Sequence, residues 1–504
     1  MAIITLTLST LLLLGLALVS VPGYSAPTQA WDLSPSLQLG IDYSNNLGLA
    51  PRDKTETFIG TLTPGISISH QGRYLQLGAD YRLSLVDYSA STRNDRYFHN
   101  LNAFADAELV EDHLFVDTQA TARQQLIDNS SAGSIDPSLA PDAFTNTLTF
   151  AFTPTWRQRI GDYTNIGLSA GYDAVVYQSD AEDSEGFNYQ LTFDTRENPN
   201  KIYWTLEMSQ DSAKSSNSSQ TLDRNDYVQA QLGYRHSRQL DLRIGSGYSD
   251  SHLDTPSNSD ISDGSTFKSA GLTWNPSPRT SVDLNYSDQI QSSSRGVVIT
   301  HRRKRGTLSL SLQQNLSSVR QQQLQAASVG SLICPAGNSI NVADCRFINP
   351  GDSAVPGPDE QLIGITALST SLNEGRFINE AFNANYSYHL RKSTLSLGLT
   401  GNRRKFQDLS GRIEKDLGFN TGWALQLSSR NSININYNWS ALEPDVNQKN
   451  SIRDNRRGLN LGFNRSLSAK TSLSSALRFN QLHSDDASRN YEEYGASFSL
   501  NHRF

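Results

Sequence analysis

The sequence predicts an all-β protein, a transmembrane antiparallel up-and-down β-barrel of about 22 strands. Segments in which apolar and polar residues alternate follow one another along almost the whole chain. Most of them reach the ~9–11 residues with which a tilted strand crosses a membrane. The connections are alternately short and long, as in outer-membrane barrels. After the N-terminal segment, no apolar run reaches the ~18 residues of a spanning helix, so a chain that crosses a membrane has to close its strands into a barrel.

The N-terminal segment predicts export. Residues 3–21 form the longest apolar run, and a Pro-Gly pair with small residues follows it, which is typical of a cleaved signal peptide. We expect a signal peptide over residues 1–26, with cleavage between residues 25 and 30, and a barrel over residues 31–504. No Lys or Arg precedes the apolar run, so an uncleaved anchor stays open as an alternative. An exported barrel of this kind belongs in the outer membrane of a Gram-negative bacterium.

The composition fits a barrel with a wet interior. Hydrophobic residues make up 37% of the chain, below the roughly 45–50% of globular domains, so the chain is either largely disordered or apolar only at alternate positions. The aromatic residues, 20 Tyr, 19 Phe and 6 Trp, favour the second interpretation. A net charge of −7 excludes the basic surplus of a nucleic-acid-binding protein. No motif for a cofactor, a metal ion or catalysis is present, and we expect none of the three.

The strand segments carry polar residues on one face and apolar residues on the other. In residues 417–427, Leu, Phe and Trp alternate with Gly, Asn and Gln, and residues 433–439 alternate Ile, Tyr and Trp with Asn. A soluble sandwich would show the same alternation. The length of the segments and their connections favour the barrel. The weakest strand lies at residues 317–327, and without it and one neighbour the number would be 20.

The C-terminal segment predicts an assembly signal. Phe498, Leu500 and the terminal Phe504 belong to an apolar alternation that resembles the signal recognised by the outer-membrane barrel-assembly machinery. The alternative is an ordinary edge strand that ends in Phe.

The short segment before the first expected strand predicts a lumen without a plug. The first strand begins near Pro35, a few residues after the expected cleavage site. We therefore expect no plug domain, and this excludes TonB-dependent transporters although they share the number of strands. Only inward-folded loops could fill the lumen, and residues 126–143 and 328–375 are long enough to do so.

Two groups of residues are candidates for a site. Residues 291–303 are predicted as a long outer loop, so four basic residues fall at an outer strand end, namely Arg302, Arg303, Lys304 and Arg305. They would contact lipopolysaccharide phosphates or another polyanion, or else form a solvated cap. Cys334 and Cys345 lie in the longest predicted outer loop and would form a loop-stiffening disulfide.

Three segments of the N-terminal third resemble a known family. Residues 31–51 (WDLSPSLQLGIDYSNNLGLAP) combine Trp, a strand, Tyr, Asn-Asn and a downstream Pro. Residues 63–83 (TPGISISHQGRYLQLGADYRL) carry a Pro-Gly pair before a Gly-Arg turn, and residues 98–120 (FHNLNAFADAELVEDHLFVDTQA) resemble the third hairpin. On these motifs the chain resembles the uncharacterised outer-membrane barrels associated with the PEP-CTERM/exosortase system. The resemblance implies a setting in exopolysaccharide production or protein sorting, and no catalytic residues.

Four functions are compatible with these patterns. The resemblance and a lumen lined by amides and hydroxyls imply a conduit or scaffold for exopolysaccharide export. The same lumen would suit a general or sugar-selective diffusion porin, or a structural surface protein blocked by its loops. An outer-membrane hydrolase is the fourth possibility, with His389 on the polar face as its candidate residue. Expected partners are outer-membrane lipid and lipopolysaccharide, the assembly machinery, and exopolysaccharide or its export proteins.

Overall fold

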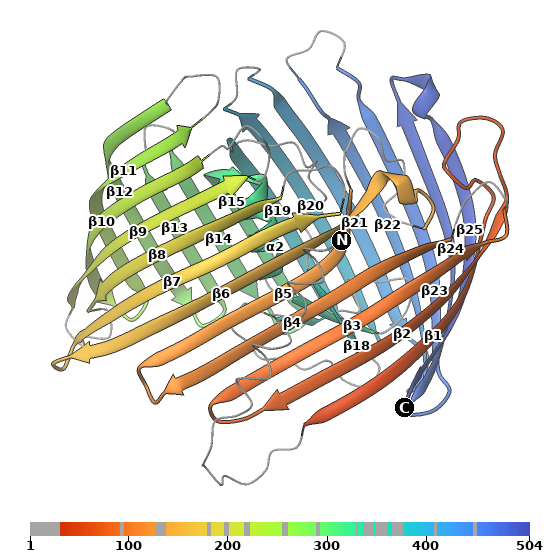
Figure 1. Ribbon diagram of the computed structural model, residues 1–504, viewed down its shortest axis with the longest axis horizontal. Coiled ribbons are helices and arrows are strands. Elements are labelled where there is room, and N and C mark those ends of the chain that lie inside the picture. Colours follow the sequence, from red (N-terminus) through yellow and green to blue (C-terminus); the bar gives the residue numbers. More distant parts are fainter. Residues whose placement is uncertain are drawn as a thin grey trace.

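The chain forms one wide barrel of tilted strands (Figure 1). The computed structural model describes residues 31–90, 95–126, 138–178, 183–195, 201–215, 222–254, 261–288, 293–328, 331–335, 346–348, 360–364, 376–407, 411–446 and 451–504. The strands of the barrel are β1 (Asp32–Ser44), β2 (Thr57–Gln71), β3 (Leu75–Tyr88), β4 (Arg96–Val110), β5 (Leu114–Leu126), β6 (Phe144–Ile160), β7 (Thr164–Tyr177), β8 (Ser184–Asp194), β9 (Ile202–Ser215), β10 (Leu222–Ser237), β11 (Leu240–Asp254), β12 (Ile261–Ser277), β13 (Thr280–Ser287), β14 (Ser294–Arg302), β15 (Gly306–Ser318), β19 (Arg376–His389), β20 (Ser393–Phe406), β21 (Ile413–Gln426), β22 (Asn431–Glu443), β23 (Asp454–Ser466), β24 (Thr471–Ser484) and β25 (Tyr491–Arg503).

These strands form a closed antiparallel sheet of 22 strands. Each strand pairs with the next one along the chain, and β15 pairs with β19 across the long segment between them. The last strand, β25, pairs with the first, β1, so that the sheet has no free edge. The prediction of an all-β barrel with 22 strands is confirmed.

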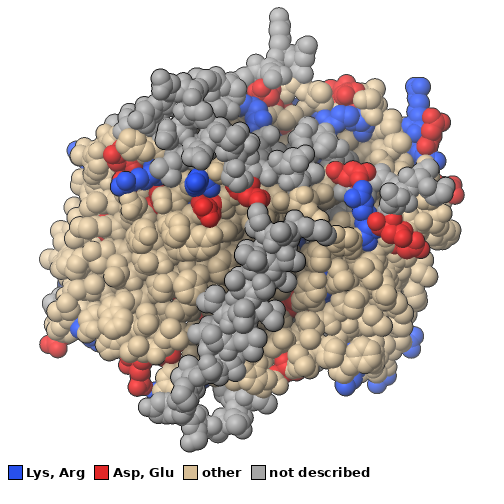
Figure 2. Space-filling model, in the orientation of Figure 1, with Lys and Arg blue, Asp and Glu red and all other residues tan. Residues whose placement is uncertain are grey.

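The two faces of the wall differ as the alternation predicts. In β1, Leu39 and Ile41 are 48% and 59% exposed and point outward, whereas Ser44 is fully buried on the inner face. Figure 2 shows that Lys, Arg, Asp and Glu gather toward the two ends of the wall, with other residues between them. This is the charge distribution of a surface that faces hydrocarbon in its middle band.

The barrel has one rim of short turns and one rim of longer loops. The short-turn rim carries the hairpins such as β2–β3 and β23–β24, the start of β1 and the end of β25. Outer-membrane barrels keep short turns in the periplasm and long loops outside, so the long-loop rim is the outer one. Trp156, Trp204 and Trp274 lie outward near the short-turn rim, at the level where aromatic rings meet lipid headgroups.

The weakest predicted strand is wrong, because residues 317–327 end β15 and continue as the helix α2 (Val319–Ser328). The helix starts with a reciprocal pair of hydrogen bonds, in which Gln321 N donates to Ser318 Oγ and Ser318 N donates to Gln321 Oε1, both at 3.2 Å. This is a capping box, and the Gln, Leu and Ala residues that follow are good helix formers. The sequence motif Ser-Val-Arg-Gln therefore carried the signal for the helix.

The predicted position of the basic residues Arg302, Arg303, Lys304 and Arg305 is also wrong. Most of residues 291–303 form β14. Arg302 ends this strand, and Arg303, Lys304 and Arg305 make the tight turn to β15 on the short-turn rim. The backbone N–H of Arg302 donates to the carbonyl of Arg279, beside the neighbouring short turn (2.7 Å). The four residues therefore lie at the periplasmic end, away from outer-leaflet phosphates.

Further elements lie between and beside the barrel strands. They are the three-stranded sheet of β16 (Ser331–Pro335), β17 (Arg346–Ile348) and β18 (Glu360–Gly364), and the 3-10 helices η1 (Pro141–Ala143) and η3 (Ala487–Arg489). Cys334 belongs to β16, but Cys345 lies outside the described residues, and so the disulfide stays a prediction. Residues 1–30, with the predicted signal peptide, lie outside them as well. No helix in the described part of the chain is long and apolar enough to cross a membrane.

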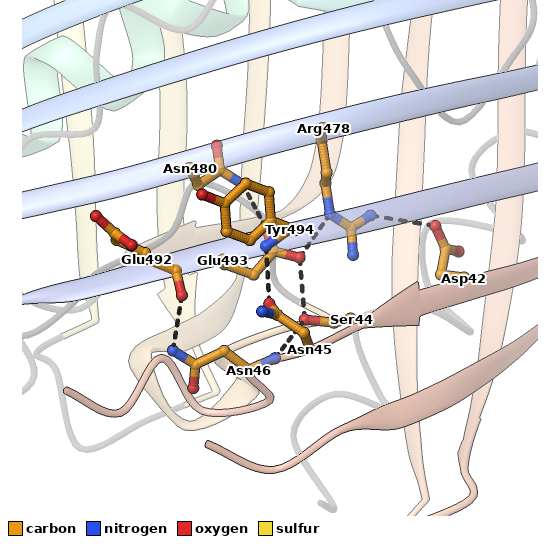
Figure 3. A network of polar contacts seen from close by, with 9 residues as sticks. All are labelled: Asp42, Ser44, Asn45, Asn46, Arg478, Asn480, Glu492, Glu493 and Tyr494. Carbon is orange, nitrogen blue, oxygen red and sulfur yellow. Dashed lines mark hydrogen bonds and ion pairs between the residues drawn. The ribbon is translucent and has the colours of Figure 1, made fainter. Parts of the chain in front are cut away.

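The seam between β25 and β1 is held by polar contacts on the inner face (Figure 3). Arg478 on β24 contacts the carboxylates of Asp42 on β1 (3.2 Å) and Glu493 on β25 (3.1 Å). The fully buried Glu493 also accepts hydrogen bonds from Ser44 Oγ and Asn480 Nδ2, both at 2.9 Å. One guanidinium thus ties the first strand to the last two strands.

The predicted terminal signal lies in the same seam. Leu500 and Phe498 on β25 pair with Leu39 and Ile41 on β1, and Phe504 N donates to the carbonyl of Pro35 (2.9 Å). The terminal segment therefore closes the barrel. Recognition by the assembly machinery stays a prediction.

We predict that Arg478→Ala destabilises the closed barrel by about 3 kcal/mol, because it leaves two buried carboxylates without their cation. The measurement is the urea midpoint of unfolding in detergent, followed by tryptophan fluorescence. Arg73→Ala is the matched control, since the Arg73–Glu111 pair is mostly exposed and contributes less than about 1 kcal/mol. Equal midpoints for the two variants would contradict the role of the seam.

Candidate functional site at the mouth of the lumen

The inner wall is rich in asparagine on one side of the barrel. Residues on the inner face of a strand share cross-strand positions, and on β19 to β24 these positions carry Asn379, Asn383, Asn385, Asn402, Asn420, Asn434, Asn436, Asn438, Asn460, Asn464 and Asn480. Carboxamides both donate and accept hydrogen bonds. This side of the lumen can therefore hold a polar ligand without a fixed charge requirement.

Helix α2 crosses the outer part of the lumen. It begins at the end of β15 and contacts β5, β6 and β7 on the other side of the ring. Arg320, on this helix, forms an ion pair with Asp173 on β7, and its guanidinium lies 3.7 Å from the carboxylate of Asp211 on β9. The side chains of Arg320 and Asp173 are only 9% and 7% exposed, so this is a buried pair. Losing one partner of such a pair is costly, which makes the contact a strong latch.

The strand between these two aspartates leaves room for the latch. Gly186 on β8 is the cross-strand neighbour of Asp173, and a Cβ atom at this position would collide with the Arg320 guanidinium. A glycine is needed here because the side chain of α2 passes directly over the backbone.

A second set of contacts anchors the start of α2. Val319 packs in a buried cluster with Phe377 and Phe406, which are cross-strand neighbours on β19 and β20. Arg404 on β20 stacks over the Phe377 ring at 5.1 Å and donates to the Gln322 side chain (2.9 Å). The helix is therefore fixed at both walls that it connects.

Two outer loops fold inward on the opposite side of the mouth. Leu47 and Leu49 from the β1–β2 connection and Leu139 before η1 are buried against the inner face of the wall. Their partners there include Ile59, Tyr88, Val86, Leu482 and Tyr491. The two connections also bond to each other, through Gly48 N and the Leu139 carbonyl at 3.1 Å. The mouth is thus narrowed from two sides.

An ionisable group with a shifted pKa lies in the outer loop between β24 and β25, at the start of η3. The hydroxyl and the backbone N–H of Ser488 donate to Asp486 Oδ1, at 2.7 and 2.9 Å. These hydrogen bonds lower the pKa of the Asp486 carboxyl below its usual value. The cap keeps its charge at neutral pH and fixes the loop between β24 and β25.

The residues predicted from the sequence do not belong to the mouth. Arg302, Arg303, Lys304 and Arg305 lie on the other rim, and His389 lies at the exposed β19–β20 turn, where its ring contacts Thr394 Oγ1 at 3.2 Å. No cluster of His, Cys, Asp or Glu within the described residues could hold a metal ion. The latch residues Arg320, Asp173 and Gly186 were missed, because Arg320 is 147 residues away in sequence from Asp173.

The fold resembles solved outer-membrane proteins. No protein-family model matches the chain, and no curated protein matches its sequence. The FrpB iron transporter from Neisseria meningitidis matches with a TM-score of 0.54 at 8% identity, over 94% of this chain and 83% of that chain. The siderophore receptor PirA from Acinetobacter baumannii matches with a TM-score of 0.52 at 10% identity, over 95% of this chain and 81% of that chain. At this identity the likeness shows the fold, and the protein is a large barrel of the bacterial outer membrane.

These likenesses correct the prediction of a barrel without a plug domain. The matched structures are TonB-dependent receptors, a class that carries a plug, and the sequence had excluded this class. The prediction relied on the few residues before Pro35. The beginning of a sequence is no measure of what occupies a lumen, whereas the strand number, which sets the width of the barrel, already agreed with this class.

The predicted functions are corrected as well. An exopolysaccharide conduit or scaffold and a diffusion porin are both contradicted, since the matched proteins are transporters and receptors for particular ligands. The comparisons do not bear on the resemblance to the PEP-CTERM-associated barrels, which stays a prediction.

We predict that Arg320→Ala raises the single-channel conductance in planar bilayers, because α2 loses its latch on β7 and β9. A loss of about 3 kcal/mol corresponds to a roughly hundredfold larger population with the helix displaced. Gly186→Ala should act in the same direction, since its Cβ occupies the place of the guanidinium.

Arg224→Ala is the control for this measurement. Arg224 pairs with Asp226 on the outward face of β10, on the opposite side of the wall from the lumen that holds α2. If the Arg320 variant conducts like the Arg224 variant and the wild type, α2 is not the constriction.

Proposed function

We propose that this protein carries a specific ligand across the outer membrane and releases it past a displaceable helix in the lumen. The observation that carries the proposal is the crossing of the mouth by α2, held by the buried Arg320–Asp173 pair. A helix held in place across the mouth obstructs free diffusion through the lumen. A carrier needs an element that blocks leakage until the ligand binds.

The chemistry of the lumen favours a polar ligand. The asparagine side of the wall offers amide donors and acceptors, and the buried ion pairs at the mouth offer both signs of charge. Ferric chelates present many oxygen acceptors, and the solved structures with this fold include an iron transporter and a siderophore receptor. A ferric chelate is therefore the ligand class that we propose first.

The same argument supports a transporter over an enzyme. His389, the one candidate for hydrolysis, lies at a short turn on the periplasmic rim and faces Thr394. The geometry offers it no acidic partner among its described contacts. Transport of an intact ligand is the function that the arrangement at the mouth supports.

We predict saturable binding of one ferric chelate to the purified protein, with a dissociation constant below about 10 μM. Equilibrium dialysis with iron-labelled ferric catecholates and ferric hydroxamates measures it, and a neutral oligosaccharide of similar size serves as the reference. Asn436→Asp places a negative charge on the inner wall and should lower the affinity for an anionic chelate by about tenfold. Gln71→Glu, at the short-turn rim, is the matched control.

The opposite outcome is as clear. A wild-type protein that conducts strongly in bilayers and binds none of the chelates saturably is a pore, and the proposal then fails.

A further inference from the structure

The outward face of the barrel carries a groove near the outer rim. It has a volume of about 860 Å³ and lies on β14, β15 and β19 to β23, which are neighbours in the wall (Figure 1). Leu312 and Leu417, both about half exposed, show that its apolar lining points away from the lumen. The groove is therefore part of the surface that meets lipid.

Two register rows across these strands line the groove. The row nearer the outer rim is polar and runs through successive cross-strand partners, Arg295, Gln314, Glu380, Arg403, Lys415 and Glu443. The row two residues nearer the short-turn rim is apolar and consists of Val297, Leu312, Phe382, Gly401, Leu417 and Ala441. The wall thus changes from apolar to charged within one two-residue step, as expected where hydrocarbon meets lipid headgroups.

The floor of the groove is hollow because small residues stand between large ones. A Cβ atom at Gly401 would meet only Leu417 Cδ1 at 3.8 Å and Phe382 Cβ at 3.9 Å, so the space above this glycine is open. Ala441 is the next small residue in the row, and Trp439 closes the groove below it. The resulting hollow is apolar and open to the lipid side.

The polar row has more cations than it can pair. Arg403 lies 3.2 Å from Glu380, with both side chains more than 40% exposed. Lys415 and Arg453, which also line the groove, form no ion pair with any carboxylate of the described residues. Within the described residues, two cations at headgroup level above an apolar hollow therefore form no ion pair, although Glu443 is the cross-strand neighbour of Lys415.

We propose that this groove binds one phosphorylated glycolipid of the outer leaflet, the lipid A part of lipopolysaccharide. An acyl chain fills the hollow at Gly401, and the lipid phosphate accepts charge-assisted hydrogen bonds from Lys415, Arg453 and Arg403. These residues differ from the basic turn at Arg302 to Arg305, which lies on the periplasmic rim.

The test measures lipid binding to the purified protein in detergent by native mass spectrometry. The probes are bis-phosphorylated lipid A, dephosphorylated lipid A and phosphatidylglycerol, and the wild type should retain one bis-phosphorylated lipid A in preference to the others. Lys415→Gln and Arg453→Gln should each lower the affinity for bis-phosphorylated lipid A by about tenfold, the loss expected for one charge-assisted hydrogen bond. Gly401→Leu should lower the affinity for both forms of lipid A, because the new side chain fills the hollow.

Matched controls lie elsewhere on the outward face. Gly60→Leu adds the same side chain at a glycine of β2 with nothing within 4 Å of its Cβ position, and Arg224→Gln removes an outward cation of β10. The heat-dependent gel mobility of each variant reports folding, and the charge variants decide the question if Gly401→Leu does not fold. Equal binding of all three lipids, or unchanged affinity in the groove variants, would overturn the proposal.

Discussion

The structure depends on one constraint, which is that no backbone polar group can remain unpaired in hydrocarbon. A sheet of 22 strands meets it only when β25 bonds to β1. The chain reinforces this pair at both ends of the seam, with Arg478 between Asp42 and Glu493 on one side and Arg503 near Asp32 on the other (3.5 Å). Once the ring is closed, every residue has a defined face, and the lumen, the mouth and the lipid-facing groove all follow from that division.

Much of the fold could be predicted from the sequence, because alternation is a local pattern and closure is the one arrangement that satisfies it in lipid. The errors fell where local patterns conflict. Residues 291–303 were predicted as a polar outer loop, whereas most of them form β14 and the charged residues after it make a tight turn. Residues 317–327 alternate weakly, and the capping box at Ser318 decided for a helix. The prediction missed β14 and added a strand at residues 317–327. The two errors cancelled, so the number stayed at 22 and the direction of every later strand was unchanged.

The mouth could not be predicted in the same way. Arg320 lies far along the chain from the hairpin of Asp173 and Gly186, and nothing local in either segment shows that they meet. Burying an ion pair in this way adds little to stability compared with apolar packing, so its value lies in specifying one position of α2. Displacing α2 therefore means breaking this one ion pair beside the apolar contacts of Val319 with Phe377 and Phe406. Under the proposed function, a ligand group that competes for one partner of the pair releases the helix.

The inner and outer faces of β19 to β23 show how one alternation serves two solvents. Inward positions carry asparagines that a polar ligand can contact, and outward positions carry an apolar band that ends abruptly at the row of Arg403 and Lys415. The same residue types on the short-turn rim, at Arg302 to Arg305, face a different compartment. Charge content therefore does not identify a lipid contact. The face on which the side chain lies and the rim that it approaches do. The pleat of the strand fixes the face, and the number of preceding turns fixes the rim.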